Sequence, residues 1–185
     1  MKRGGKMKSR RIVMNALFVG LAIVLSRFLS VRIPIGGAEG IRFGIGTLPV
    51  ILTGISLGPL DGAVVGAVSD LLGYFIYPMG AFMPQFTLTS LLYGLIPGLL
   101  FRYILRKRLT FANLFITSMI AEVIGITITP LLINQLFQIP WAVLMPPRLI
   151  TFVLRIIINP MIIFELLKRV PQLRTGMMLP MEKKS

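Results

Sequence analysis

Residues 58–77 read GPLDGAVVGAVSDLLGYFIY, and this stretch decides the fold. Gly58-Pro59 is a tight turn, because both residues break regular structure. The run from Leu60 to Tyr77 is apolar and approaches the length of about 20 residues that a helix needs to cross a bilayer. Without the turn this helix would merge with the apolar segment before it, so Gly58-Pro59 favours six spans over four.

Five further apolar segments flank this helix, with expected bounds 11–30, 43–57, 85–105, 111–134 and 148–167. Segment 43–57 is short, so we expect it to tilt or to begin inside the preceding loop. The N-terminal run is long enough to span and no small-residue cleavage site follows it, which favours a first helix over a signal peptide. The predicted fold class is therefore all-α, an integral membrane bundle of six transmembrane helices.

The charges predict how this bundle is oriented. Of 20 Lys and Arg, fifteen fall in three clusters, at residues 2–11, 102–108 and 168–184. The positive-inside rule places these clusters, and hence both termini, in the cytoplasm. Three loops then lie outside, at 30–42, 77–84 and 135–147. The inner turn at Gly58-Pro59 has no positive charge of its own. We divide the chain into a basic tail (1–10), the transmembrane domain (11–168) and a second basic tail (169–185).

Composition excludes several function classes. Hydrophobic residues make up 55% of the chain, and its net charge is +14. The basic residues lie at the ends of apolar spans, so we interpret the positive charge as setting the orientation in the membrane and contacting anionic lipids. We therefore expect no nucleic-acid partner. The chain has no Cys and no His, which excludes disulfides and metal sites of those residues. It has no P-loop motif and no nucleophile beside a base. We expect no enzymatic activity, no cofactor and no metal.

Five arginines lie outside the basic clusters. They have two possible roles: they reach toward headgroups or pair with acids, or they line a pocket that captures an anion from outside. We favour the pocket for three of them, Arg32, Arg42 and Arg148, and a structural role for Arg27 and Arg155.

Three acids fall within predicted spans, where a charge costs about 2.5–3.5 kcal/mol even on the lenient insertion scale. Each should therefore have a partner. We expect Glu122 to pair with Arg155, and Glu165 to face Lys168 or Arg169. For Asp70 two partners remain open, Arg27 and a ligand.

Small residues recur at four-residue spacing on two helices, which lets helix backbones approach closely. We assign Gly62, Gly66, Ala63 and Ala67 to packing within the bundle. The pair Ala16 and Gly20 on the first helix either packs internally or forms an outward-facing seam that docks another membrane subunit.

Three runs, at 42–49, 58–73 and 77–89, resemble the S components of energy-coupling-factor (ECF) vitamin transporters. Run 77–89 and the segment Pro146-Pro147-Arg148 look most like the folate-specific branch. The resemblance covers about Asn15 to Lys168. It implies a six-helix subunit in a bacterial cell membrane that binds one vitamin from outside, with a transmembrane coupling subunit and two ATPases as partners. It also implies that Ala16 and Gly20 dock the coupling subunit, although the family's usual second Ala is Gly here.

A folate site would need apolar walls, hydrogen-bonding groups for the pterin edge and arginines for the two carboxylates of the tail. The candidates for stacking are Tyr77, Phe82 and Trp141, which could instead be anchors at the membrane interface. The candidates for hydrogen bonding are Asp70, Gln85 and Asn134. The candidates for charge are Arg32, Arg42 and Arg148.

Two other functions remain open. The chain could be an S component for another vitamin such as riboflavin, whereas the excess of outer arginines disfavours a cationic vitamin such as thiamin. It could also be a standalone small polytopic membrane protein, such as a channel, an enzyme or a lipid-binding scaffold.

Overall fold

The computed structural model describes residues 3–35, 38–78, 82–105, 109–170 and 173, with the backbone alone for 3–8, 31–35 and 38–43. Its described elements are α1 (Arg3–Ile23), the π-helical turn η1 (Val24–Phe28), β1 (Val31–Ile35), β2 (Ala38–Phe43), α2 (Leu48–Ser56), α3 (Pro59–Ile76), α4 (Pro84–Leu99), the π-helical turn η2 (Leu100–Ile104), α5 (Phe111–Phe137) and α6 (Trp141–Arg169).

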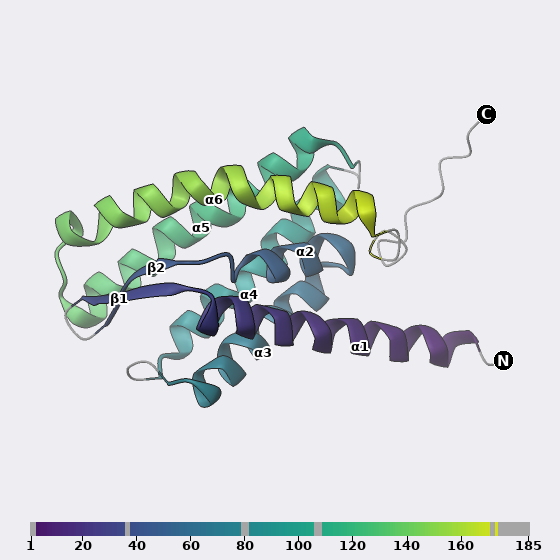
Figure 1. Ribbon diagram of the computed structural model, residues 1–185, viewed down its shortest axis with the longest axis horizontal. Helices are drawn as coiled ribbons and strands as arrows, with labels where there is room; N and C mark the ends of the chain where they lie inside the picture. The colour runs from purple at the N-terminus through teal and green to yellow at the C-terminus, as the bar shows by residue number, and fades with distance from the viewer. Residues whose placement is uncertain (1–2, 36–37, 79–81, 106–108, 171–172, 174–185) are drawn as a thin grey trace.

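Five of the described helical segments are long and apolar enough to cross a bilayer: Ser9–Phe28, Pro59–Ile76, Pro84–Ile104, Phe111–Phe137 and Trp141–Arg169. Together with α2 they form the predicted all-α bundle of six helices (Figure 1). Figure 1 also shows that α1 begins and α6 ends at the same end of the bundle. Which side of the membrane that end occupies stays a prediction.

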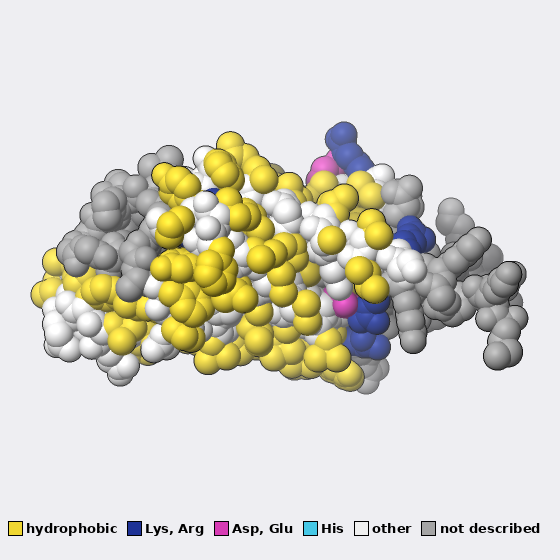
Figure 2. All heavy atoms as spheres, turned by 90° about the horizontal axis from the view of Figure 1, so that it is seen from below, with side chains coloured by type: hydrophobic (Ala, Val, Ile, Leu, Met, Phe, Trp, Pro, Cys, Tyr) yellow, Lys and Arg dark blue, Asp and Glu magenta, His cyan; other side chains and the backbone are white. Residues whose placement is uncertain are grey.

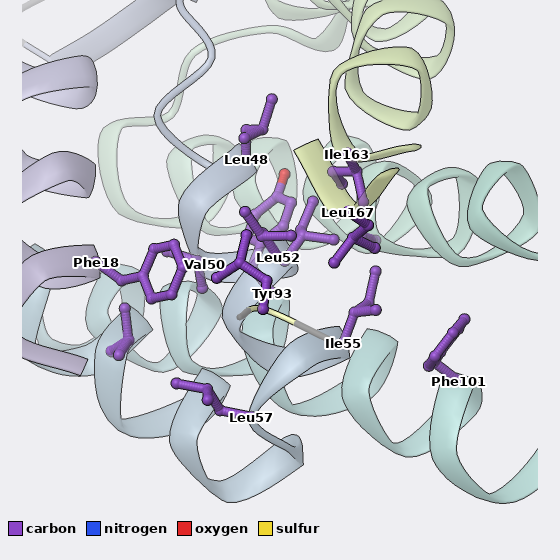
Figure 3. Packing of buried hydrophobic residues seen from close by; sticks show 14 of the residues in the cluster. Phe18, Leu48, Val50, Leu52, Ile55, Leu57, Tyr93, Phe101, Ile163 and Leu167 are labelled. Atoms are coloured by element: carbon purple, nitrogen blue, oxygen red, sulfur yellow. The ribbon is translucent and has the colours of Figure 1, made fainter. Parts of the chain in front are cut away.

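The helix α2 has only nine residues and does not fit the expected span over 43–57. All nine are buried, because α2 lies in the centre of the bundle against α1, α3, α4 and α6. Figure 3 shows side chains of α2, such as Leu52 and Ile55, surrounded by Phe18, Phe101 and Leu167 from neighbouring helices. A helix that is apolar all round is stable only when it is covered all round, which explains why so short an element belongs to the core.

Glycines let α2, α3 and α4 approach closely. A Cβ added to Gly94 would lie 2.1 Å from the carbonyl oxygen of Gly62, and one added to Gly54 would lie 2.3 Å from the carbonyl oxygen of Gly94. A Cβ on Gly66 would lie 2.1 Å from the carbonyl oxygen of Ser90. The predicted packing role of Gly62 and Gly66 is therefore confirmed.

The segment expected to be a loop at 30–42 contains a β-hairpin. Strands β1 and β2 pair antiparallel, with Arg32 opposite Arg42. Figure 1 shows the hairpin beyond the end of α1 and beside α6, which β2 contacts. We call this end of the molecule the hairpin end. The hairpin therefore occupies an end of the molecule that neither η1 nor the short helix α2 reaches.

The sequence predicts a loop over 135–147, and this prediction is largely wrong because helices occupy most of the range. Helix α5 continues to Phe137 and ends at Gln138, whose φ of 55° is the left-handed conformation that commonly terminates helices. Helix α6 then begins at Trp141 and carries Pro146 and Pro147 inside it. Prolines are tolerated in membrane helices when neighbouring groups satisfy the freed carbonyls. One turn further on, the hydroxyl of Thr151 donates to the carbonyls of Pro147 and Arg148.

The opposite end of the molecule, which we call the basic end, supplies charge to the turn at Gly58-Pro59. Arg11 makes an ion pair with Asp61 and also donates to it from Nε at 2.7 Å, while Asn15 donates to the same carboxylate at 2.8 Å. A Cβ on Gly58 would lie 3.3 Å from the guanidinium of Arg102. Figure 2 shows hydrophobic side chains over the middle of one face, with Lys and Arg gathered toward the basic end. The positive charge beside the turn therefore comes from Arg11 on α1 and Arg102 on η2.

Candidate functional site

A cavity of about 150 Å³ lies between the helices in the half of the bundle nearer the hairpin end. Its walls come from the end of α1 and from η1, the second half of α3, the first half of α4, the second half of α5 and the middle of α6. The segment before α2 contributes Gly46 and Thr47. Six stretches of the chain thus converge on one polar space inside an apolar bundle.

The helix α6 presents one face to this cavity. Arg148, Thr151, Phe152 and Arg155 all line it. Their spacing of three, four and seven residues places them on the same side of the helix. Arg148 and Arg155 are two turns apart, which separates their Cα atoms by about 10 Å along the axis. This face offers two guanidinium groups with an aromatic ring between them.

Glu122 on α5 is the most deeply buried charge among the described residues that line the cavity. Its side chain is 3% exposed, and its Oε2 lies 3.7 Å from a guanidinium nitrogen of Arg155. Its Oε1 accepts hydrogen bonds from Asn159 at 3.0 Å and from Thr47 at 3.4 Å. The predicted pair Glu122–Arg155 is confirmed, and through Thr47 it also anchors the segment that leads into α2.

A second ion pair forms near the hairpin end. The guanidinium of Arg27, on η1, lies 3.6 Å from Asp70, and Thr87 on α4 donates to the same carboxylate at 2.9 Å. A Cβ on Gly73 would lie 2.9 Å from Nε of Arg27. The absence of a side chain at Gly73 on α3 therefore leaves space for the guanidinium of Arg27. Of the two partners considered for Asp70, Arg27 is confirmed. Asp70 also lines the cavity, and its contact with a ligand stays a prediction.

The π-helical turn η1 sets the positions of Ser26 and Arg27. A π turn inserts an extra residue into a helix and often occurs at functional sites. Here it places Ser26 on the cavity wall and Arg27 toward α3. A Cβ on Gly46 would lie 2.6 Å from Cβ of Ser26, so the segment before α2 packs directly on this turn.

The comparisons with known proteins agree with this architecture. The family described as ECF-type riboflavin transporter, S component, matches residues 6–169. This chain belongs to that family. An S component is a multi-pass bacterial membrane protein and a substrate-binding subunit without catalytic activity of its own, as the sequence predicts.

Three relatives give the match more detail. The folate transporter FolT of Clostridium novyi (strain NT) is 42% identical over 90 residues, which is 49% of this chain and 49% of the relative. The aligned segment thus spans about half the length of that relative. A crystal structure of FolT bound with folic acid matches with a TM-score of 0.72 and 25% identity, over 84% of this chain and 90% of the other. The S component of a bacterial ECF transporter matches with a TM-score of 0.63 and 19% identity, over 89% and 97%, which supports the fold.

Two of the predicted site residues of this S component line the cavity, Asp70 and Arg148. Five others lie toward the hairpin end and do not line it: Tyr77, Phe82, Gln85, Asn134 and Trp141. Tyr77 is 50% exposed with its ring 6.4 Å from that of Phe28, and Phe82 packs against Tyr74 with 5.1 Å between rings. Asn134 donates to the carbonyl of Ile139 and so stabilises the α5–α6 turn. Their roles in binding stay predictions.

Arg32 and Arg42 face each other in the register of the hairpin, and their side chains lie outside the described part of the structure. Ala16 and Gly20 are exposed on α1, and a Cβ on Gly20 would meet nothing among the described residues within 4 Å. Of the two alternatives for this pair, the structure favours an outward-facing seam over internal packing.

Sequence reasoning missed several cavity residues of this S component. Phe86, Tyr93 and Phe152 are its described aromatic walls, whereas the sequence directed attention to aromatics in the loops. One signal could have found Phe152, because it lies four residues after Arg148 and three before Arg155 on a helix. Nothing comparable distinguishes Tyr93 from a core residue. Its hydroxyl occupies the space where a Cβ on Gly125 would lie, a contact between helices that no local pattern encodes.

Proposed function

We propose that this S component is the high-affinity substrate-binding subunit for folate uptake. It captures the vitamin from the outer side of the membrane and delivers it inward together with a transmembrane coupling subunit and two ATPases. The observation that carries this proposal is the cavity face of α6, where Arg148 and Arg155 line a space enclosed by an apolar bundle.

The chemistry of folate fits such a space. The vitamin has a flat pterin at one end and two carboxylates at the other, and arginine binds carboxylates through paired hydrogen bonds. The cavity also has aromatic walls against which a ring can pack. Its volume of about 150 Å³ is below the range of about 300–1,000 Å³ of typical ligand pockets. We therefore expect it to enclose the ring end of the vitamin, and the tail to extend past Arg148 toward the hairpin end with its carboxylates near that guanidinium.

The comparisons support folate in particular. The relative from Clostridium novyi is named a folate transporter, and the FolT structure that matches most of this chain contains folic acid. The family as a whole is named for riboflavin, which is therefore the second candidate. Riboflavin has no carboxylate, so it lacks the anionic oxygens that arginine binds through paired hydrogen bonds.

Direct binding tests the proposal. The full chain, purified in detergent, is titrated with folic acid and with riboflavin while the emission of Trp141, its single tryptophan, is followed. We expect saturable quenching by folic acid at submicromolar concentration and none by riboflavin over that range. A yellow preparation that releases riboflavin on denaturation, with no response to folic acid, would contradict the proposal.

The exposed face of α1 supports the partner assignment. Ala16 and Gly20 lie on a surface that also exposes Val13, Leu17 and Leu21. In a membrane, close approach of helix backbones across small residues replaces the hydrophobic effect as the source of association. We therefore assign this face to the coupling subunit.

A further inference from the structure

Several hydroxyl groups on the cavity wall have their protons committed to the backbone. Ser69 donates to the carbonyl of Gly66 at 3.0 Å, and Thr89 donates to the carbonyl of Gln85 at 2.9 Å. Both side chains line the cavity and both residues are buried, at 5% and 4% exposure. A hydroxyl has one donor and two acceptor lone pairs. With the donor used inside the helix, the capacity that remains for a ligand is that of an acceptor.

Ser69 on α3 and Thr89 on α4 line the same part of the cavity as Asp70. A Cβ on Gly66 would lie 2.1 Å from the carbonyl oxygen of Ser90, so α3 and α4 touch at that level. Further toward the hairpin end, Thr87 donates to Asp70. Ser69 and Thr89 lie between these two contacts. Asp70 adds a carboxylate, whose two oxygens offer about four acceptor positions, and Arg27 and Thr87 occupy only part of them.

The cavity is therefore polarised. The wall made by α3 and α4 carries acceptors (Ser69, Asp70 and Thr89), whereas the wall made by α6 carries the guanidinium donors of Arg148 and Arg155. A ligand that fits must present N–H groups to one side and anionic oxygens to the other. Lone pairs placed against the acceptor wall would be repelled and left unpaired.

We propose that Ser69, Asp70 and Thr89 form an acceptor wall that selects ligands by the amino-substituted edge of their ring. The inference rests on the proposed function and deepens it, because it assigns ring selectivity to this wall. The ring edge of folate presents an amino group, then a ring N–H, then a carbonyl. The matching edge of riboflavin presents a ring N–H between two carbonyls, so one of its lone-pair groups replaces the amino donor.

The ligand pair that tests this wall is folic acid and its desamino analogue, which has hydrogen in place of the ring amino group. Binding to the full chain in detergent is measured by titration calorimetry. We expect the wild type to bind the analogue about tenfold or more weakly than folic acid, because without the amino group a buried acceptor of the wall has no hydrogen-bond donor. In Thr89→Val, which keeps the shape and removes the oxygen, folic acid should bind about three- to tenfold more weakly, and the preference over the analogue should shrink.

Two further variants make the test specific. Thr89→Ser restores the oxygen and should recover the preference. Thr127→Val is the matched control, because Thr127 also donates to its own helix, at the carbonyl of Val123, but is exposed and does not line the cavity. Equal binding of both ligands by the wild type, or a Thr89→Val variant that behaves like Thr127→Val, would overturn the acceptor wall while leaving folate as the substrate. Absence of any folic acid binding would overturn both.

Discussion

At the scale of single residues, the interior of this protein is organised around paired charges. Glu122 is held by Arg155, Asn159 and Thr47, which belong to two other segments of the chain. Burying one charge of such a pair alone costs several kcal/mol, whereas in the pair the attraction between the two charges offsets this cost. The network therefore fixes the relative positions of α5, α6 and the entry to α2, and with them part of the cavity wall.

Removing one member of this pair should be strongly destabilising. Glu122→Gln leaves the guanidinium of Arg155 without its counter-charge, and we expect a loss of about 3–5 kcal/mol in the free energy of unfolding. Unfolding in mixed micelles with increasing SDS measures it. The double variant Glu122→Gln/Arg155→Met removes both charges and should recover part of the loss. A single variant as stable as wild type would show that the pair contributes nothing to the fold.

Arg148 should act on the carboxylate end of the ligand. Arg148→Gln removes a charge-assisted hydrogen bond worth about 1.5–3 kcal/mol, so folic acid should bind about ten- to a hundredfold more weakly. A pterin without the glutamate tail should bind as it does to wild type. Arg169→Gln is the control, because Arg169 is an exposed arginine paired with Glu165 on the same helix. Unchanged folic acid binding by Arg148→Gln would remove this residue from the site.

The sequence predicts the ion pairs well and the cavity poorly, for a physical reason. Few acids lie in the spans, so each carboxylate there has few possible partners. The pair of Glu122 with Arg155 follows from charge alone, whereas the sequence leaves two partners open for Asp70 and two for Glu165, of which Arg27 and Arg169 are the ones observed. Cavity walls depend instead on which apolar faces meet. Phe86 and Tyr93 look like ordinary core residues until the packing of α4 is known.

At the scale of elements, backbone contact between helices decides the architecture. The short buried helix α2 is held where Gly54, Gly62 and Gly94 bring three backbones together. The sequence predicts the helix interfaces through this small-residue spacing. The hairpin was missed although Gly36-Gly37 separates two runs with alternating apolar residues, a typical hairpin pattern, because glycines and prolines suggested a loop.

A methyl group at this contact should disturb it. The Cβ of Gly94→Ala would lie 2.1 Å from the carbonyl oxygen of Gly62, and the helices must separate to accept it. We expect destabilisation of about 1–3 kcal/mol, measured as a lower midpoint of thermal unfolding in detergent. Gly20→Ala is the matched control, since its methyl group meets open space among the described residues and should not lower stability. Equal stability of the two variants would argue against the close approach.

At the scale of the whole molecule, the proposed binding cavity and the exposed seam of α1 lie on different parts of one subunit. The cavity occupies the half nearer the hairpin end, whereas Ala16 and Gly20 face outward from the bundle. Binding and coupling should therefore be separable by substitution.

A bulky residue on the seam should stop transport and spare binding. Gly20→Leu keeps the surface apolar but prevents close approach of a partner helix. We expect unchanged folic acid affinity in the purified subunit and loss of folate uptake when it is expressed with the coupling subunit and ATPases. Val153→Leu, at an exposed position on α6, should leave both properties intact. Impaired folic acid binding by Gly20→Leu would mean that these positions serve internal packing.

The most direct test of the account is the position of the ligand itself. A structure of the full chain determined with folic acid should show the vitamin in the cavity between α3, α4, α5 and α6. We expect its ring edge against Ser69 and Thr89 and its carboxylates near the guanidinium of Arg148. Folic acid bound elsewhere, with this cavity filled by side chains or lipid, would contradict the account.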